Sequence, residues 1–282
     1  MQMTAKRDGV RLVYETAGDG VPVVLLPAWM ITNRRVWAAQ VAALAERFRV
    51  VSYDGRGSGE SDRPLHDGAY EPIELVEDVL AVLDAAGVER AVLVGNSLGG
   101  LVGYLTAALH PSRVAGLALI GPTVDLSGEQ PSALQEAAAR FDEDPGPGAS
   151  GWELYNRYSW ERDFPRFVDW FVATALGPEG DAAARAEGRV QGLDATPEVL
   201  AASIARRRGA DPARLRALTW RITAPVLVIN GDRDEICPPA WSREIAALLT
   251  ARHAELAGAG HCPHVTRPLE VAGLLTDFIG GL

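Results

Sequence analysis

Residues 91–100 read AVLVGNSLGG, and this stretch decides the fold. Its first four residues are apolar without interruption, which is typical of a strand buried on both faces of a parallel sheet. A G-x-S-x-G pattern follows at Gly95-Asn96-Ser97-Leu98-Gly99, and residues 101–110 after it have helical character. A strand, a sharp turn and a helix around one serine predict a nucleophile elbow, in which a strained turn presents Ser97 Oγ to a pocket.

The predicted elbow also suits a negative charge that develops next to the serine. The helix after Ser97 directs its first N–H groups and the positive end of its dipole at this point. A G-x-S-x-G pattern by itself also fits a glycine-rich loop with an incidental serine. The strand before the pattern and the helix after it favour the elbow.

Length and composition restrict the class of protein. The chain has 282 residues, of which 48% are hydrophobic and 23% charged, as expected for a globular protein. A net charge of −10 disfavours binding to a phosphate backbone. The first residues lack an apolar signal core and no long apolar run follows, so we expect a cytoplasmic protein without a membrane span. Cys237 and Cys262 are expected to be reduced thiols, and no spacing typical of a metal site occurs.

Apolar strands alternate with amphipathic helices along most of the chain. Strands are expected at residues 10–16, 21–27, 49–54, 91–94, 114–120, 224–230 and 253–256, and helices at residues 35–47, 73–86, 101–110, 240–249 and 269–279. This alternation predicts an α/β fold whose central sheet is mainly parallel, with helices on both faces.

The alternation stops between residues 123 and 220, where the sequence is helical, polar and rich in large aromatic side chains. We therefore expect a core domain formed by residues 1–122 and 221–282, and a helical cap formed by residues 123–220. The aromatic rings form either a small core of the cap or the wall of a binding pocket. Those expected to contact a substrate are Trp152, Tyr155, Tyr158 and Trp160.

A serine is a weak nucleophile and needs a base that is itself oriented by a carboxylate. The chain supplies Ser97, then an aspartate after the strand that ends at residue 230, then His261 after the last strand. The order serine, aspartate, histidine is the one expected around a nucleophile elbow. Asp232 and Asp234 both fit the second place by position, and Asp125 follows the preceding strand.

Taken together, these motifs resemble those of a capped α/β-hydrolase over essentially the whole chain. The resemblance rests on residues 50–62 (VVSYDGRGSGESD), 95–99 (GNSLG), 231–234 (GDRD) and 260–263 (GHCP). It implies that Asp234, at the fourth position of a G-x-x-D turn, is the acid of the triad and that Asp232 supports the turn. It also implies that His261 is the base, that His264 is a packing residue, and that no cofactor or metal is used.

An oxyanion hole requires two backbone N–H groups. One is expected at Leu98, directly after the nucleophile. The resemblance implies that the other comes from the loop after residues 21–27, at Trp29. Here the family usually has His-Gly-X, whereas this sequence has Pro27-Ala28-Trp29.

The expected function is hydrolysis of a carboxylic ester of a small, largely apolar molecule through an acyl-enzyme. Family members with the same triad also cleave carbon–carbon bonds in vinylogous diketones, hydrolyse lactones or thioesters, or act as cofactor-free perhydrolases. Some members with an intact triad are small-molecule receptors. A serine at position 97 argues against haloalkane dehalogenase and epoxide hydrolase chemistry, for which the family uses aspartate at the elbow.

Overall fold

An eight-stranded sheet organises the computed structural model, which describes residues 2–129, 131–207 and 211–282. The strand order is β1-β2-β4-β3-β5-β6-β7-β8; β1 and β2 are antiparallel, β2 is antiparallel to β4, and every other pair of neighbours is parallel. The strands are β1 (Gln2–Arg7), β2 (Val10–Ala17), β3 (Pro22–Leu26), β4 (Arg49–Tyr53), β5 (Ala91–Asn96), β6 (Val114–Ile120), β7 (Val226–Gly231) and β8 (Arg252–Leu256). The predicted fold class is confirmed.

Side chains that alternate along the strands divide the core into two layers. Val24 and Leu26 of β3 pack in one cluster with helices α2 (Pro72–Ala85), α3 (Leu98–Leu109), α8 (Pro212–Thr219) and α9 (Pro239–Leu249). Val23 and Leu25 pack in the other cluster with η1 (Arg34–Trp37), α1 (Ala38–Leu44) and α11 (Pro268–Gly280). Short turns of helix, η2 (Pro111–Arg113) and α10 (Pro263–Thr266), precede β6 and α11.

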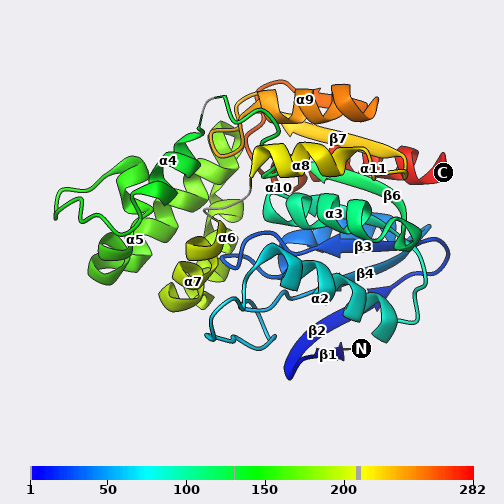
Figure 1. Ribbon diagram of the computed structural model, residues 1–282, viewed down its shortest axis with the longest axis horizontal. Helices are drawn as coiled ribbons and strands as arrows, with labels where there is room; N and C mark the ends of the chain where they lie inside the picture. The colour runs from blue at the N-terminus through cyan, green and yellow to red at the C-terminus, as the bar shows by residue number, and fades with distance from the viewer. Residues whose placement is uncertain (1, 130, 208–210) are drawn as a thin grey trace.

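Between β6 and α8 the chain leaves the sheet and forms a group of helices at one end of it (Figure 1). We call this group the inserted helices: α4 (Ala133–Ala139), η3 (Gly151–Leu154), α5 (Arg157–Leu176), η4 (Gly177–Glu179), α6 (Ala182–Asp194) and α7 (Pro197–Arg207). They lie beyond the carboxyl ends of the parallel strands, because the chain enters this group from the carboxyl end of β6. Helix α8, at the end of the range expected for the cap, packs instead on α3, where the Tyr104 hydroxyl donates to the Leu215 carbonyl (2.8 Å).

The N-terminal strand β1 is absent from the sequence-based expectation. It forms a hairpin with β2 in which Arg7 pairs with Val10, so Asp8 and Gly9 are the whole loop. Both loop residues have positive φ (48° and 83°), as a two-residue hairpin turn requires. The Asp-Gly pair is the signal that predicts this hairpin. None of the described helices combines the length and apolar character that crossing a membrane would need.

Candidate active site

Ser97 lies at the junction of β5 and α3 in a strained backbone conformation. Its φ is 55° and its ψ is −118°, a region that residues other than glycine seldom adopt. A Cβ on Gly95 would lie 2.2 Å from the Gly99 carbonyl oxygen, and a Cβ on Gly99 would lie 2.6 Å from the Pro27 carbonyl oxygen. The two glycines of G-x-S-x-G are therefore required because backbone segments approach each other closely on both sides of Ser97.

His261 and Asp234 form a buried hydrogen-bonded pair. Asp234 follows β7 and His261 follows β8, and the distance from Asp234 Oδ2 to His261 Nδ1 is 2.8 Å. The other carboxylate oxygen, Oδ1, accepts the N–H groups of Ile236 and Cys237, each at 2.8 Å. A carboxylate fixed in this way holds the proton of the neutral imidazole on Nδ1 and leaves Nε2 as a hydrogen-bond acceptor.

The other two candidate aspartates have different partners. Asp232 Oδ1 accepts the N–H of Gly258 (2.6 Å) and so ties the loop that follows β7 to the loop that follows β8. Asp125 Oδ1 accepts the N–H groups of Ser127 and Gly128 at 3.1 and 2.9 Å. Of the three aspartates, Asp234 is the one that bonds to His261.

The loop that carries His261 is attached to the residue preceding Ser97. Asn96 Nδ2 donates to the carbonyl oxygens of both His261 and Ile120, each at 3.0 Å. The Ser97 hydroxyl itself lies 3.3 Å from Thr123 Oγ1, and among the described residues it makes no hydrogen bond to His261. Catalytic hydrogen bonds are often long or absent without substrate, so this geometry is compatible with a serine–histidine pair.

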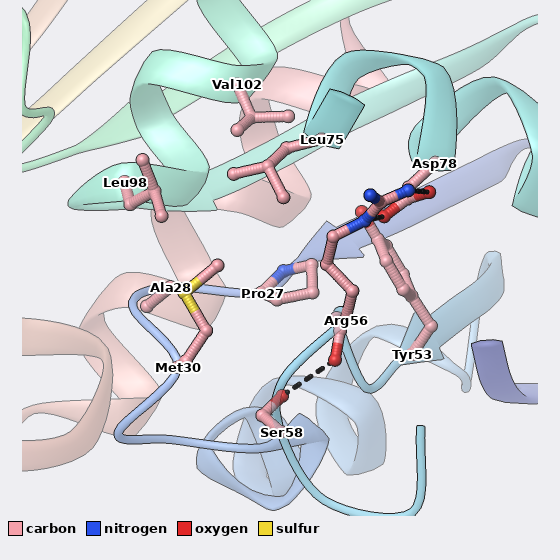
Figure 2. A pocket seen from close by; sticks show the side chains of 11 residues that line it. Pro27, Ala28, Met30, Tyr53, Arg56, Ser58, Leu75, Asp78, Leu98 and Val102 are labelled. Carbon is pink, nitrogen blue, oxygen red and sulfur yellow. Dashed lines mark hydrogen bonds and ion pairs between the residues drawn. The ribbon is translucent and has the colours of Figure 1, made fainter. Parts of the chain in front are cut away.

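The loop after β3 lies against the start of α3, where the Pro27 carbonyl oxygen approaches Gly99. Pro27, Ala28 and Met30 from this loop line a narrow pocket together with Leu98 (Figure 2). Ala28 is buried, so the alanine that replaces the family's usual glycine is accommodated in this backbone. The loop that contains Trp29 and the helix turn that contains Leu98 therefore border the same pocket.

The Trp29 side chain is embedded in the inserted helices. Its indole Nε1 donates to Ser203 Oγ of α7 (2.8 Å), and both residues are buried. The ring contacts Phe171, Tyr155, Trp160 and Phe167 at centroid distances of 5.2, 5.5, 6.2 and 6.3 Å. A residue expected to stabilise the oxyanion is therefore in direct contact with the inserted helices.

A cavity of about 530 Å³ lies between the inserted helices and the core. Thr123, which contacts the Ser97 hydroxyl, is one of its lining residues, so the cavity extends to the immediate surroundings of Ser97. Most of its wall is apolar, with contributions from Leu101 of α3, Leu134 of α4 and Trp241 of α9. Sequence reasoning missed Thr123; its place directly after β6, at the edge of the sheet that carries Ser97, is the signal that could have found it.

The four aromatic residues expected to contact substrate have different surroundings. Tyr155 lines the cavity. Trp160 is buried within the ring cluster, with centroids 4.7 Å from Phe167 and 5.0 Å from Phe141. Trp152 packs against Tyr155 and Trp170, and Tyr158 is half-buried in the first turn of α5.

These surroundings predict different consequences for two aromatic substitutions. Trp160→Ala should lower the free energy of unfolding by roughly 3–5 kcal/mol and leave the substrate ratio unchanged, because the ring packs inside the cluster. Tyr155→Ala should lower stability as well, but it should in addition change the ratio of kcat/KM between aryl and acetyl esters, because this ring borders the cavity. Urea denaturation and kcat/KM on both esters test the pair. A changed ratio in Trp160→Ala, or an unchanged ratio in Tyr155→Ala, would contradict the assignment.

His264 is fully buried and stacks on Trp37, with ring centroids 4.4 Å apart. Burial, followed by the nearby His261, lowers the pKa of His264 to about 3. Neither ring nitrogen has a hydrogen-bond partner among the described residues. Cys262, between the two histidines, is held in the thiol form because burial, and then the charge of Asp234, raise its pKa to about 12.

The lowered pKa of His264 predicts a loss of stability in acid. Below pH 6.5 the unfolded chain takes up a proton at this histidine that the folded chain excludes, so protonation favours unfolding. The free energy of unfolding should therefore fall by up to about 1.4 kcal/mol per pH unit as the pH drops from 6.5 toward 3. Urea denaturation at pH 7, 5.5 and 4.5 should give a shallower pH slope for His264→Gln than for the unchanged protein. Equal slopes would contradict this account.

Comparison with known proteins identifies the class that this fold and site define. Residues 21–268 match the model of a family described as alpha/beta hydrolase fold. The chain belongs to this family and is an enzyme. Its relatives are named as hydrolases, which supports catalysis over the receptor interpretation.

Individual relatives span nearly the whole chain. The chain is 30% identical to the proposed carbamate hydrolase RutD of Klebsiella pneumoniae over 270 residues, which cover 93% of each protein. It is 29% identical to epoxide hydrolase A of Mycobacterium tuberculosis, over 98% of this chain and 96% of the relative. Among solved structures, esterase RhEst1 from a Rhodococcus species is 30% identical with a TM-score of 0.81, covering 100% of this chain and 98% of the esterase.

Proposed function

We propose that this hydrolase cleaves a carboxylic ester of a small, largely apolar molecule through Ser97, His261 and Asp234. The observation that carries the proposal is the strained serine at the elbow, beside a cavity and close to a buried histidine–aspartate pair. The 30% identity to an esterase of the same fold supports an ester as the bond that is cleaved.

In the proposed reaction Ser97 Oγ attacks the substrate carbonyl while His261 Nε2 accepts the hydroxyl proton. Asp234 keeps the imidazole in the required tautomer and stabilises the imidazolium that forms. The backbone N–H groups of Leu98 and Trp29 bind the oxyanion. His261 then protonates the leaving alcohol, and a water molecule, deprotonated by His261, releases the acid from the acyl-enzyme. Every step uses a group of the chain or water.

Two features of the structure suit this sequence of steps. The Ser97 hydroxyl contacts Thr123, and in the proposed reaction it exchanges this contact for a hydrogen bond to His261 by a change of side-chain rotamer. The inserted helices act as a cap, because they cover the cavity and hold Trp29 through Ser203. A cap over the cavity limits the access of water and so strengthens the hydrogen bonds to the oxyanion.

A lactone is the second candidate substrate. Two solved structures of 27–28% identity are titled as an N-acyl homoserine lactone degrading enzyme (Est816) and the enol-lactonase of Burkholderia xenovorans. A lactone is a cyclic ester, so the same residues would open it. For epoxide cleavage, the activity named for the Mycobacterium relative, the serine at position 97 is unsuited because the family uses an aspartate there.

A substrate panel tests the proposal. Initial rates and total product would be measured for aryl esters, alkyl esters, lactones, a carbamate, a vinylogous diketone and an epoxide, each at a substrate excess of about a hundredfold over enzyme. The proposal predicts many turnovers on esters and slower or no turnover on the diketone and epoxide. Turnover of the carbamate or the diketone with no ester hydrolysis would overturn it.

A further inference from the structure

The cavity beside Ser97 contains one charged group that the proposed reaction does not use. Asp125 is 6% exposed and lines the cavity. Among the lining residues that the structure describes, it is the only carboxylate and none is a lysine, arginine or histidine. Since the surrounding wall is mostly apolar, this carboxylate is the strongest polar feature that a substrate meets in the cavity.

The two oxygens of Asp125 have unequal surroundings. Oδ1 accepts the N–H of Ser127 (3.1 Å), the hydroxyl of Ser127 (3.3 Å) and the N–H of Gly128 (2.9 Å). Oδ2 accepts a single long hydrogen bond of 3.3 Å, from Gln135 Nε2 of α4. Within the described part of the chain, no arginine or lysine pairs with this carboxylate.

This arrangement leaves a buried carboxylate oxygen with unused capacity to accept hydrogen bonds. A carboxylate accepts hydrogen bonds and donates none, and a buried one is stabilised by each donor that it gains. The Cα atoms of Asp125 and Thr123, two residues apart, are at most about 7 Å from each other. Because Thr123 contacts the Ser97 hydroxyl and both Thr123 and Asp125 line the cavity, Asp125 belongs to the part of the cavity wall next to the nucleophile.

We infer that Asp125 selects substrates that carry a hydroxyl, amide N–H or ammonium donor close to the scissile ester, and that it rejects anionic ones. This inference rests on the proposed function and narrows its substrate class. A donor near the ester replaces the missing partner of Oδ2, whereas a carboxylate on the substrate would be buried next to a like charge.

The test compares three p-nitrophenyl esters whose acyl chains differ at the third carbon, with the uncatalysed rate of each ester subtracted. This carbon carries a hydroxyl donor in the 3-hydroxybutanoate, a methyl group in its place in the 3-methylbutanoate, and a carboxylate in the unbranched succinate. We expect kcat/KM to favour the hydroxyl ester over the methyl ester by at least about tenfold, with the succinate slowest. A second comparison, of 2-hydroxypropyl acetate with 2-methylpropyl acetate, tests whether the enzyme prefers a donor on the alcohol part of the ester. A preference in either series supports the inference.

Asp125→Asn distinguishes this role from support of the turn. Asparagine retains an oxygen that can accept the N–H groups of Ser127 and Gly128, but it removes the negative charge. We expect the hydroxyl preference to fall severalfold and the succinate ester to gain about tenfold relative to the methyl ester. A variant that is merely destabilised would slow all three esters alike. Asp181→Asn is the matched control: Asp181 also accepts a backbone N–H, from Ala184 (2.7 Å), but it is exposed at the N-cap of α6, so the ratios should stay unchanged.

The results separate failure of the inference from failure of the proposed function. If the unchanged enzyme hydrolyses the hydroxyl and methyl esters equally well in both series, and Ser97→Ala abolishes this hydrolysis, only the inference about Asp125 is overturned. If Ser97→Ala hydrolyses the esters as fast as the unchanged enzyme, or if the enzyme hydrolyses none of them, the proposed function fails and the inference fails with it.

Discussion

Ser97→Ala is expected to lower kcat/KM for ester hydrolysis by at least about a thousandfold while the protein stays folded. The remaining hydrogen-bond donors around the elbow cannot replace the attack of Oγ on the carbonyl. Alanine has a Cβ like serine, so the positive φ at this position costs about as much in the variant as in the unchanged protein. Steady-state kinetics together with urea denaturation measure both quantities.

A second serine provides the control for this substitution. Ser159 is buried in α5, and its hydroxyl donates to the carbonyl of Glu153 (3.0 Å). Ser159→Ala should reduce stability by about 1 kcal/mol and leave kcat/KM within about twofold. Retention of more than about a tenth of the activity by Ser97→Ala would show that another group attacks the substrate.

Asp234→Asn is expected to reduce kcat by up to about ten-thousandfold. The amide of asparagine can donate to His261 Nδ1, which moves the imidazole proton to Nε2 and removes the acceptor that Ser97 needs. Asp232→Asn removes the same charge two residues earlier. It should cost less than about tenfold, because Asp232 bonds to the Gly258 N–H and not to His261.

The pH profiles of the two variants add a second readout. The loss in Asp234→Asn should persist at every pH between 6 and 9, because it reflects the position of a proton on the ring and not the charge of a distant group. A severe loss in Asp232→Asn with a mild loss in Asp234→Asn would show that the other aspartate orients the histidine.

Much of the fold is predictable from local sequence. Local physical requirements explain three features of the sequence: the apolar run at residues 91–94, the glycines around Ser97 and the apolar strands that resume after residue 220. Gly95 and Gly99 are a clear example, because backbone atoms occupy the space that a Cβ would fill. The order of serine, aspartate and histidine then places all three residues at the same edge of a parallel sheet.

Other features depend on contacts between distant segments and leave little local signal. The sequence around Trp29 predicts an ordinary loop residue. In the structure its ring packs among aromatic side chains that are more than a hundred residues away in the sequence. From its sequence position Asp125 is an alternative partner for His261. Its place in the cavity wall depends on the path of the chain after β6. The identities of cavity-lining residues depend on how the inserted helices pack, which spacing along the sequence does not specify.

The most direct test of the central claim is labelling with a fluorophosphonate, which reacts with a serine activated by a histidine. The unchanged enzyme should gain one phosphonyl group, located by peptide mass spectrometry at Ser97, with loss of ester hydrolysis in step with labelling. His261→Gln should react at least about a hundredfold more slowly, since the base that activates the serine is missing. Labelling at a different serine, or full labelling with undiminished hydrolysis, would contradict the assignment of Ser97 as the nucleophile.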